Sequence, residues 1–180
     1  MSARCSVMAI SGSTRKNSSN QRLLQFIVEH APEFNWKFSA GIDTLPHFNP
    51  DLDTDPAPEA VAVFRQQVKA ADAILICTPE YAMGVPGSLK NALDWMVSSA
   101  SFFQKPVGLI TASSVGALGH ASLLETLAII ESKLDEKAQL LLPHIKARFD
   151  AEGHLKPETA ELVKQFISGF STFVSEFSVH

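Results

Sequence analysis

The segment Ser6-Val-Met-Ala-Ile10 runs directly into Ser11-Gly-Ser-Thr-Arg-Lys-Asn-Ser-Ser-Asn20, and these fifteen residues decide the fold. An apolar run, a small hydroxyl-rich turn and then a helical pattern (Leu23, Leu24, Ile27) predict a strand, a turn and a helix. Such a turn exposes unpaired backbone N–H groups at the positive end of a helix dipole, which is an anion site. The hydroxyl groups of the turn and the charges of Arg15 and Lys16 favour a phosphate. The same residues also suit a solvent-exposed loop with an N-cap.

Two common phosphate-binding turns are excluded by the glycine content. A P-loop needs a second glycine followed by Lys-Ser or Lys-Thr, and a dinucleotide fingerprint needs three spaced glycines. This turn has only Gly12. We therefore expect side chains, in addition to the backbone, to hold the phosphate.

The composition predicts one domain over residues 1–180, because 46% of the 180 residues are hydrophobic and 19% are charged. A net charge of −4 with scattered basic residues argues against a nucleic-acid partner. The sequence has neither an apolar run of about 20 residues nor a signal peptide, so we expect a cytoplasmic protein without a membrane partner. Cys5 and Cys77 are expected as buried thiols in strands. The histidines lack metal-ligand spacing, and no metal is expected.

Strands and helices are expected to alternate along the chain. The strands are predicted at residues 4–10, 36–39, 73–77, 106–111 and 139–142. The first helix is predicted at 20–31, and four others carry apolar stripes: Val61, Phe64, Val68; Leu89, Ala92, Leu93, Met96, Val97; Leu123, Leu124, Leu127, Ala128, Ile130; and Leu162, Val163, Phe166, Ile167, Phe170, Phe173, Val174, Phe177. Trp95 falls off its stripe, which indicates either a partly exposed side chain or a subunit contact.

This alternation predicts an α/β protein with a parallel sheet and helices on both faces. If the strand order is 2-1-3-4-5, the order reverses between the first and third strands, and ligands bind at that point beyond the carboxyl ends. The loop 78–86 would then lie beside the turn 12–20. The small-residue turn at 112–120, after the fourth strand, ends at the same edge. One elongated ligand with a phosphate and a planar group would fit both ends of such a site.

Three motifs resemble the NADPH-dependent FMN reductase family, which includes quinone, azo and chromate reductases. The first motif, Gly-Ser-x-Arg-x-x-Ser-x-Asn, is matched by Gly12, Ser13, Arg15, Ser18 and Asn20. The second motif, Pro-Glu-Tyr followed by Pro-Gly-x-Leu-Lys-Asn-Ala-x-Asp-Trp, is matched by Pro79, Glu80, Tyr81, Pro86, Gly87, Leu89, Lys90, Asn91, Ala92, Asp94 and Trp95. The third motif, Ser-x-Gly-x-x-Gly, is matched by Ser114, Gly116 and Gly119.

The resemblance implies a flavodoxin-like three-layer sandwich that binds FMN, with NADPH or NADH as electron donor. The FMN phosphate would lie on the turn 12–20, and the isoalloxazine ring would lie against the loop 79–83 and beside the loop 113–119. The implied cofactor-binding residues are Ser13, Arg15, Ser18, Ser19, Asn20, Pro79, Glu80, Tyr81, Ala82, Met83, Ser114 and Gly116. The implied acceptor is a small molecule: a quinone, an azo compound, a metal oxyanion or free flavin. The family's assembly implies a homodimer or homotetramer, built around the helix after the Pro-Glu-Tyr loop.

No catalytic residue is expected, because hydride transfer between stacked rings needs no protein acid or base. Glu80 and Tyr81 are expected to have loop-bonding and packing roles. The Lys90–Asp94 pair, spaced i, i+4, is expected as a surface ion pair. Two other functions stay open: an FMN electron carrier without a nicotinamide site, and a phosphate-binding or regulatory protein that has lost its flavin.

The sequence departs from the family's motifs in two turns. Many relatives have Asn after Pro-Glu-Tyr, where this chain has Ala82 and Met83. The third motif usually ends Gly-Gly, whereas here Gly119 precedes His120.

Overall fold

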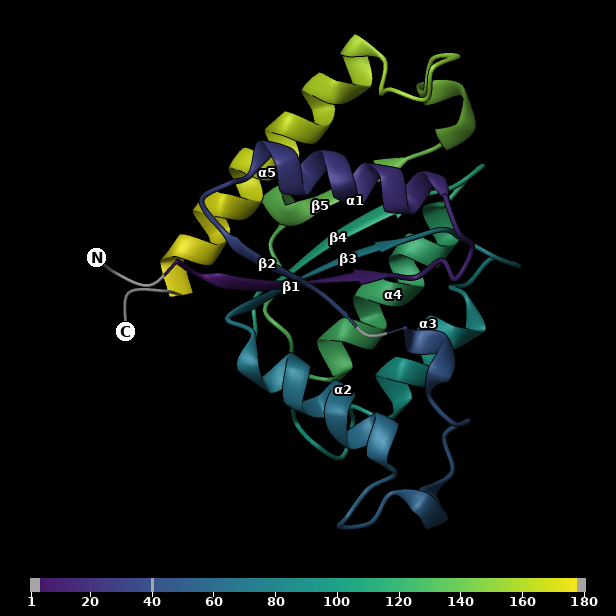
Figure 1. Cartoon of the computed structure of the whole chain (residues 1–180), viewed down its shortest axis with the longest axis vertical. Coiled ribbons are helices and arrows are strands. Elements are labelled where there is room, and N and C mark those ends of the chain that lie inside the picture. Colours follow the sequence, from purple (N-terminus) through teal and green to yellow (C-terminus); the bar gives the residue numbers. More distant parts are fainter. Residues whose placement is uncertain (1–3, 40, 178–180) are drawn as a thin grey trace.

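Five parallel strands form the centre of the molecule (Figure 1). They are β1 (Ser6–Ser11), β2 (Asn35–Phe38), β3 (Ala73–Thr78), β4 (Val107–Ala112) and β5 (Gln139–Leu142). Their order is β2-β1-β3-β4-β5, and every neighbouring pair is parallel. The predicted order is confirmed, with its switch point between β1 and β3. The computed structural model describes residues 4–39 and 41–177.

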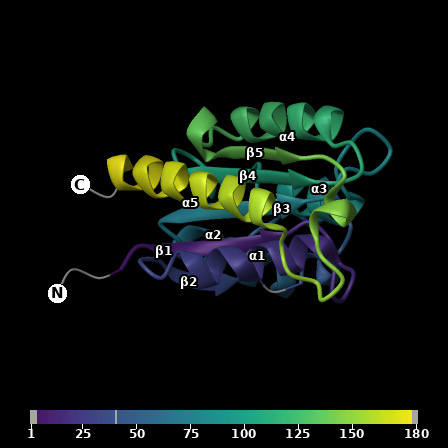
Figure 2. The same ribbon diagram turned by 90° about the horizontal axis from the view of Figure 1, so that it is seen from above.

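Helices cover both faces of this sheet, as predicted for a flavodoxin-like sandwich. One face carries α1 (Ser19–His30) and α5 (Pro157–Phe177), and the other carries α2 (Glu59–Ala70), α3 (Gly87–Asp94) and α4 (Ala117–Ile129). Figures 1 and 2 show α1 and α5 side by side on their face of the sheet. The elements follow the expected alternation, and short 3-10 turns lie at Ile42–Thr44, Pro50–Leu52, Glu136–Ala138 and Ile145–Arg148.

Alternating side chains along the strands divide the core into two halves. In β1, Val7 and Ala9 pack toward α1 and α5, whereas Met8 and Ile10 pack toward α2 and α3. All six residues of β3 (73–78) are buried, because both faces of a central parallel strand are covered by helices. This burial explains why the strands read as continuous apolar runs rather than alternating ones.

The structure corrects the interpretation of Trp95. Its side chain is fully buried, so it neither lies at the surface nor anchors a subunit contact. The indole N–H donates to the carbonyl oxygen of Pro46 (2.8 Å), and the ring of Phe48 packs edge-on against it with centroids 5.0 Å apart. The long connection after β2 therefore folds back over the end of α3 and covers the position that helical periodicity placed outside.

Several other residues that were expected in the core are exposed, because a helix ends before them or because they lie on a helix face that no other element covers. Val97 is exposed, since α3 ends at Asp94 and the chain leaves the helical track. Ala128, Leu162 and Phe177 are also exposed. Cys5 is half-buried and precedes β1, whereas Cys77 is buried as expected. Within the described residues, no helix is both long enough and apolar enough to cross a bilayer.

Candidate functional site

The turn after β1 is held by its own serines. The backbone N–H of Ser13 donates to the hydroxyl of Ser11 (3.3 Å), and that hydroxyl donates to the carbonyl oxygen of Ser13 (3.1 Å). Ser18 caps α1, because its hydroxyl accepts from the backbone N–H of Gln21 at 3.1 Å. Asn17 has a φ of 56°, which turns the chain sharply before the helix begins. The turn is therefore shaped before any ligand binds.

Donor groups remain available in this turn. Across residues 4–39 and 41–177, the backbone N–H groups of Thr14, Lys16 and Asn17 have no recorded protein acceptor. Arg15 and Lys16 are exposed and form no ion pair within the same residues. Free N–H groups around a left-handed residue, with two cations beside a helix N-terminus, are an arrangement suited to an anion.

Glycine at position 12 lets the turn lie directly against the end of β3. The Gly12 N–H donates to the carbonyl oxygen of Cys77 at 2.8 Å. A Cβ at this position would lie 2.2 Å from the Thr78 hydroxyl oxygen, which is an impossible contact. The first turn and the loop after β3 are therefore in contact through the backbone.

Asn20 joins three segments at this edge of the sheet. Its side-chain N–H donates to the carbonyl oxygen of Ala112 at the end of β4 (3.2 Å), and its amide oxygen accepts from the Cys77 thiol (3.3 Å). Burial raises the pKa of the Cys77 thiol, which keeps the donor proton in place. Asn20 itself is buried, so its amide holds the ends of α1, β3 and β4 in register.

The loop after β3 contains a two-residue tight turn. The backbone of Tyr81 and the backbone of Gly84 exchange two hydrogen bonds, each 2.9 Å long. The central residues, Ala82 and Met83, have φ values of 50° and 62°. A turn with positive φ at both centres is the type that normally carries Asn-Gly. The departure of this chain from the family's Asn therefore lies in a strained turn.

Glu80 fastens this loop to α4. Its carboxylate accepts from the backbone N–H of Gly119 at 2.7 Å, in the first turn of the helix, and its carbonyl oxygen accepts from the Ser113 hydroxyl at 3.2 Å. A Cβ at Gly119 would lie 2.8 Å from the carbonyl oxygen of Gly84. The Glu80 carboxylate is thus already bonded, as the loop-bonding interpretation predicts.

The turn after β4 supplies the third side of the site. Gly116 precedes α4 with a φ of 103°, and this N-cap glycine has no side chain of its own to cap the helix. Ser114 is exposed, while its carbonyl oxygen accepts from the backbone N–H of His144 at 3.1 Å. Within the described chain, Ser114 therefore presents its hydroxyl outward while its backbone is fixed.

His120 follows this turn and is half-buried. Its Nδ1 forms a 2.8 Å hydrogen bond with the Thr111 hydroxyl. Burial lowers the pKa of His120, and a hydrogen bond with Gln139 acts in the opposite direction. The imidazole is therefore neutral near pH 7 and links α4 to β4 and β5.

The structure brings all twelve predicted site residues to the carboxyl edge of the sheet. Ser13, Arg15 and Ser19 lie on the first turn or at the start of α1, while Ser18 and Asn20 use their side chains within the protein. The others lie on the loops after β3 and β4, where Pro79 is buried and Tyr81, Ala82 and Met83 are exposed. Sequence reasoning missed two hydroxyl groups: that of Thr78, which donates to the carbonyl oxygen of Pro79 at 3.0 Å, and that of Ser113, which donates to the carbonyl oxygen of Glu80. The available signal was a hydroxyl residue at the end of a strand, because Thr78 is the last residue of β3 and Ser113 follows β4.

Comparisons with known proteins agree with this geometry. The family model described as NADPH-dependent FMN reductase matches residues 5–147. This chain belongs to that family. A 2-hydroxy-1,4-benzoquinone reductase from a Burkholderia species is 33% identical over 94% of this chain and 96% of the relative. An NAD(P)H-dependent FMN reductase of Pseudomonas aeruginosa is 34% identical over 97% of each chain.

A solved structure supports the same assignment. The flavoenzyme NAD(P)H:acceptor oxidoreductase FerB from Paracoccus denitrificans aligns with a TM-score of 0.77 and 28% identity, covering 96% of this chain and 98% of that one. The chain is accordingly an NAD(P)H-dependent FMN oxidoreductase by family, with FMN as cofactor and NADPH or NADH as donor. The turn after β1 fits the FMN phosphate, because it offers free N–H groups and the exposed guanidinium group of Arg15.

Proposed function

We propose that this member of the family reduces a quinone, and that the three turns at the carboxyl edge form its FMN site. One observation carries the proposal: Asn20, Glu80 and Gly12 tie the turns after β1, β3 and β4 to one another. A phosphate site and two flanking loops, held rigidly at the topological switch point, match an elongated nucleotide with a planar ring.

The proposed roles follow the contacts described above. Ser13, Arg15 and Ser19 bind the phosphate group, while Ser18 and Asn20 shape the turn that receives it. Pro79 through Met83 present backbone and side-chain atoms to one side of the ring. Ser114 and Gly116 are proposed to border the other side, since Glu80 and Ser113 hold these two loops together.

When bound, FMN supplies the chemistry: it accepts a hydride from the donor and passes electrons to the acceptor. The protein positions the reactants and needs no acid–base residue. One carboxylate oxygen of Glu80 accepts the N–H of Gly119, which gives this side chain a role in holding the loop against α4. We therefore assign no catalytic residue.

A quinone is favoured by the surface beside the loop after β3. Tyr81 is 50% exposed and Met83 is 72% exposed, which gives a planar apolar acceptor two side chains to contact. Relatives named quinone reductase in Pseudomonas putida and Escherichia coli are 30% identical over 97% and 98% of this chain.

Anaerobic stopped-flow mixing of the FMN-loaded protein with NADH and with NADPH tests the function. We expect the oxidised flavin band to bleach and to return when a benzoquinone is added. An azo compound and a metal oxyanion serve as competing acceptors, and faster reoxidation by either one would reject the quinone. A band that persists with both donors would reject the reductase function and favour an electron carrier.

We further propose a homodimer that forms through α4 and not around α3, the helix after the Pro-Glu-Tyr loop, because the expected anchor at the end of α3, Trp95, is buried. Its outer stripe contains Leu118, Glu125 and Ile129, with small residues between them, and Leu118 and Ile129 are 56% and 79% exposed. An apolar face with one charge is typical of a subunit contact. Sedimentation should show a dimer that Ile129→Glu converts to monomer, whereas Val63→Glu on α2 should leave it intact. A wild-type monomer would refute the assembly.

We also propose that residues 1–180 form one domain and that the protein works in the cytoplasm. The division of the described residues into two cores on one shared sheet supports the first statement. The second is supported by Cys5 and Cys77, which form no disulfide among the described residues, and by the need for a reduced nicotinamide donor. Cell fractionation with an antibody to the native protein tests the location.

A further inference from the structure

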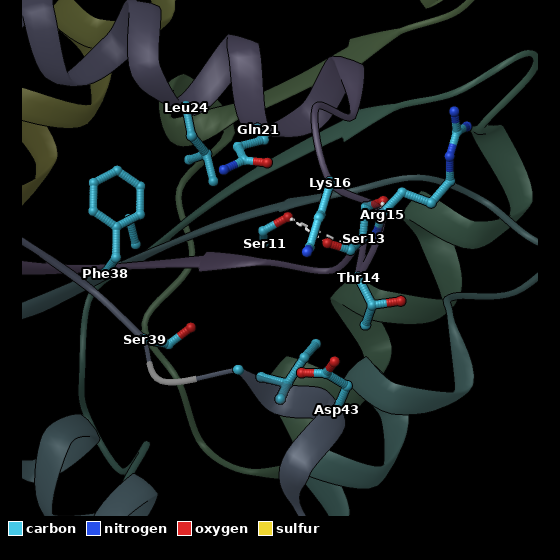
Figure 3. Close-up of a pocket in the computed structure, with 13 residues that line it drawn as sticks. Ser11, Ser13, Thr14, Arg15, Lys16, Gln21, Leu24, Phe38, Ser39 and Asp43 are labelled. Carbon is cyan, nitrogen blue, oxygen red and sulfur yellow. Dashed lines mark hydrogen bonds between the residues drawn. The ribbon is translucent and has the colours of Figure 1, made fainter.

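A pocket of about 340 Å³ lies on the β2 side of the phosphate turn (Figure 3). Every residue that lines it belongs to β1, the turn 13–16, the start of α1, the end of β2 or the segment 41–43. The family's FMN ring, by contrast, is assigned to loops after β3 and β4. Because β2 and β3 lie on opposite sides of β1, an occupant of this pocket lies away from the ring loops.

The pocket combines an apolar floor with a polar rim. Ala9 and Leu24 are buried at its base, and the ring of Phe38 forms one wall with 53% of its surface exposed. Figure 3 shows the amide of Gln21 on the same side as Phe38, and the ammonium of Lys16 near Ser11 and Ser13. An exposed aromatic face beside an amide group and a cation is suited to a base and a phosphate.

Arg15 and Lys16 diverge from the turn. In Figure 3 the Arg15 side chain extends away from Phe38, whereas Lys16 reaches toward the pocket's interior. Two anionic groups can therefore each have a separate cation, one on either side of the turn. The carboxylate of Asp43 on the far rim is a hydrogen-bond acceptor for sugar hydroxyl groups.

We propose that this pocket binds the 5′-adenylate half of the nicotinamide dinucleotide donor, an inference that rests on the proposed function. Adenine packs on Phe38 with its edge toward Gln21, the ribose hydroxyls donate to Asp43, and the 5′-phosphate pairs with Lys16. The volume lies near the lower end of the range for ligand pockets, roughly 300–1,000 Å³, which suits a mononucleotide rather than a whole dinucleotide.

The position of the pocket explains how the other half of the donor reaches the flavin. The residues 13–16 line this pocket and also form the turn assigned to the FMN phosphate. A donor anchored by its adenylate half therefore lies directly beside the bound cofactor. Its nicotinamide half then extends across the turn toward the loops after β3 and β4.

Isothermal titration of the FMN-loaded, oxidised protein with 5′-AMP tests the site without turnover. We expect saturable binding that weakens about tenfold in Phe38→Ala, because the base loses its stacking partner. Phe103→Ala is the matched control, since Phe103 is 54% exposed in another pocket, and it should bind 5′-AMP normally. Absence of binding, or equal loss in both variants, would overturn the proposal.

The phosphate contact has its own control. Lys16→Gln should weaken the binding of 5′-AMP and affect the binding of adenosine far less. Lys164→Gln on α5 should change the affinity for neither ligand. A truncated donor, 1-benzyl-1,4-dihydronicotinamide, separates this inference from the function. The quantity to compare is kcat/KM for NADH divided by kcat/KM for the truncated donor. A decrease of about tenfold in this quotient in Phe38→Ala would support the adenylate site. An unchanged quotient with normal flavin reduction would refute the site and leave the reductase function intact.

Discussion

The turn at Ala82 and Met83 should become more stable when its residues are replaced by Asn and Gly. Both residues have positive φ, at 50° and 62°, and the flanking backbone groups of Tyr81 and Gly84 hold them there through paired 2.9 Å hydrogen bonds. Left-handed backbone is unfavourable for side chains with a Cβ, least so for Asn and not at all for Gly. The double variant Ala82→Asn/Met83→Gly therefore removes strain without removing a hydrogen bond.

The size of the effect follows from the two φ values. Each residue with a Cβ destabilises the folded protein by roughly 1–2 kcal/mol in this conformation. Replacement by Asn and Gly removes most of that cost, about 2–3 kcal/mol in total. The new glycine lowers the gain in stability by roughly 0.5–1 kcal/mol, because it increases the conformational entropy of the unfolded chain. We expect the free energy of unfolding to rise by about 1–2.5 kcal/mol, with Tm higher by about 2–10 °C for a chain of this size.

Urea unfolding of the FMN-free protein, followed by far-UV circular dichroism, measures this change at constant m-value. The control is Ala62→Gly on the exposed side of α2, which should lose about 1 kcal/mol, since glycine there meets an ordinary helical backbone. A double variant that is no more stable than wild type would refute the strain argument. The same variant should raise the KM for a benzoquinone, because Met83 contributes exposed apolar surface beside the proposed acceptor site.

Three further predictions concern the contacts that hold the site together. Asn20→Ala leaves the Ala112 carbonyl without its hydrogen-bond partner and should destabilise the protein by about 1–3 kcal/mol. It should also weaken FMN binding in a fluorescence titration, and an unchanged FMN affinity would contradict the positioning role. Gly119→Ala places a Cβ 2.8 Å from a loop carbonyl and should weaken FMN binding. Gly87→Ala, whose added Cβ would have no atom within 4 Å, should leave FMN binding unchanged, and equal effects of the two variants would refute the close-contact argument. Burial lowers the pKa of His120, so the unfolded chain binds its proton first as the pH falls below 6.5, and stability should decrease there. His120→Gln should flatten that part of the urea-stability profile, and an identical slope would exclude this histidine as the cause.

Local pattern was sufficient for most of the fold. The stretch from Ser6 to Asn20 predicts a strand, a turn suited to an anion and a helix, and the structure confirms the strand, the turn and the helix. The strand order was expected from the resemblance to flavodoxin-like flavoproteins, since strict alternation of strands and helices restricts the parallel topologies without selecting one of them. The motif residues converge on one edge for the same reason: in a parallel sheet every strand ends on that side.

The burial or exposure of a side chain could not be predicted where it depends on segments distant in the sequence. Helical periodicity placed Trp95 on an outer surface, yet the connection around Pro46 and Phe48 buries it. Periodicity likewise counted Val97 in a stripe that extends beyond the end of α3. A local pattern describes one element's own symmetry, whereas burial depends on whatever segment packs against that element.

The sequence by itself determined the parallel sheet, the turn after its first strand and the family motifs, because each follows from short-range spacing of side chains. Only the tertiary structure decided what those motif residues do: the amide of Asn20 bonds to two other strands, the carboxylate of Glu80 caps α4, and a pocket opens between the first turn and β2. These roles arise from contacts between residues 33 to 92 positions apart, and such distances are set by the packing of whole layers rather than by any neighbouring residues in the chain.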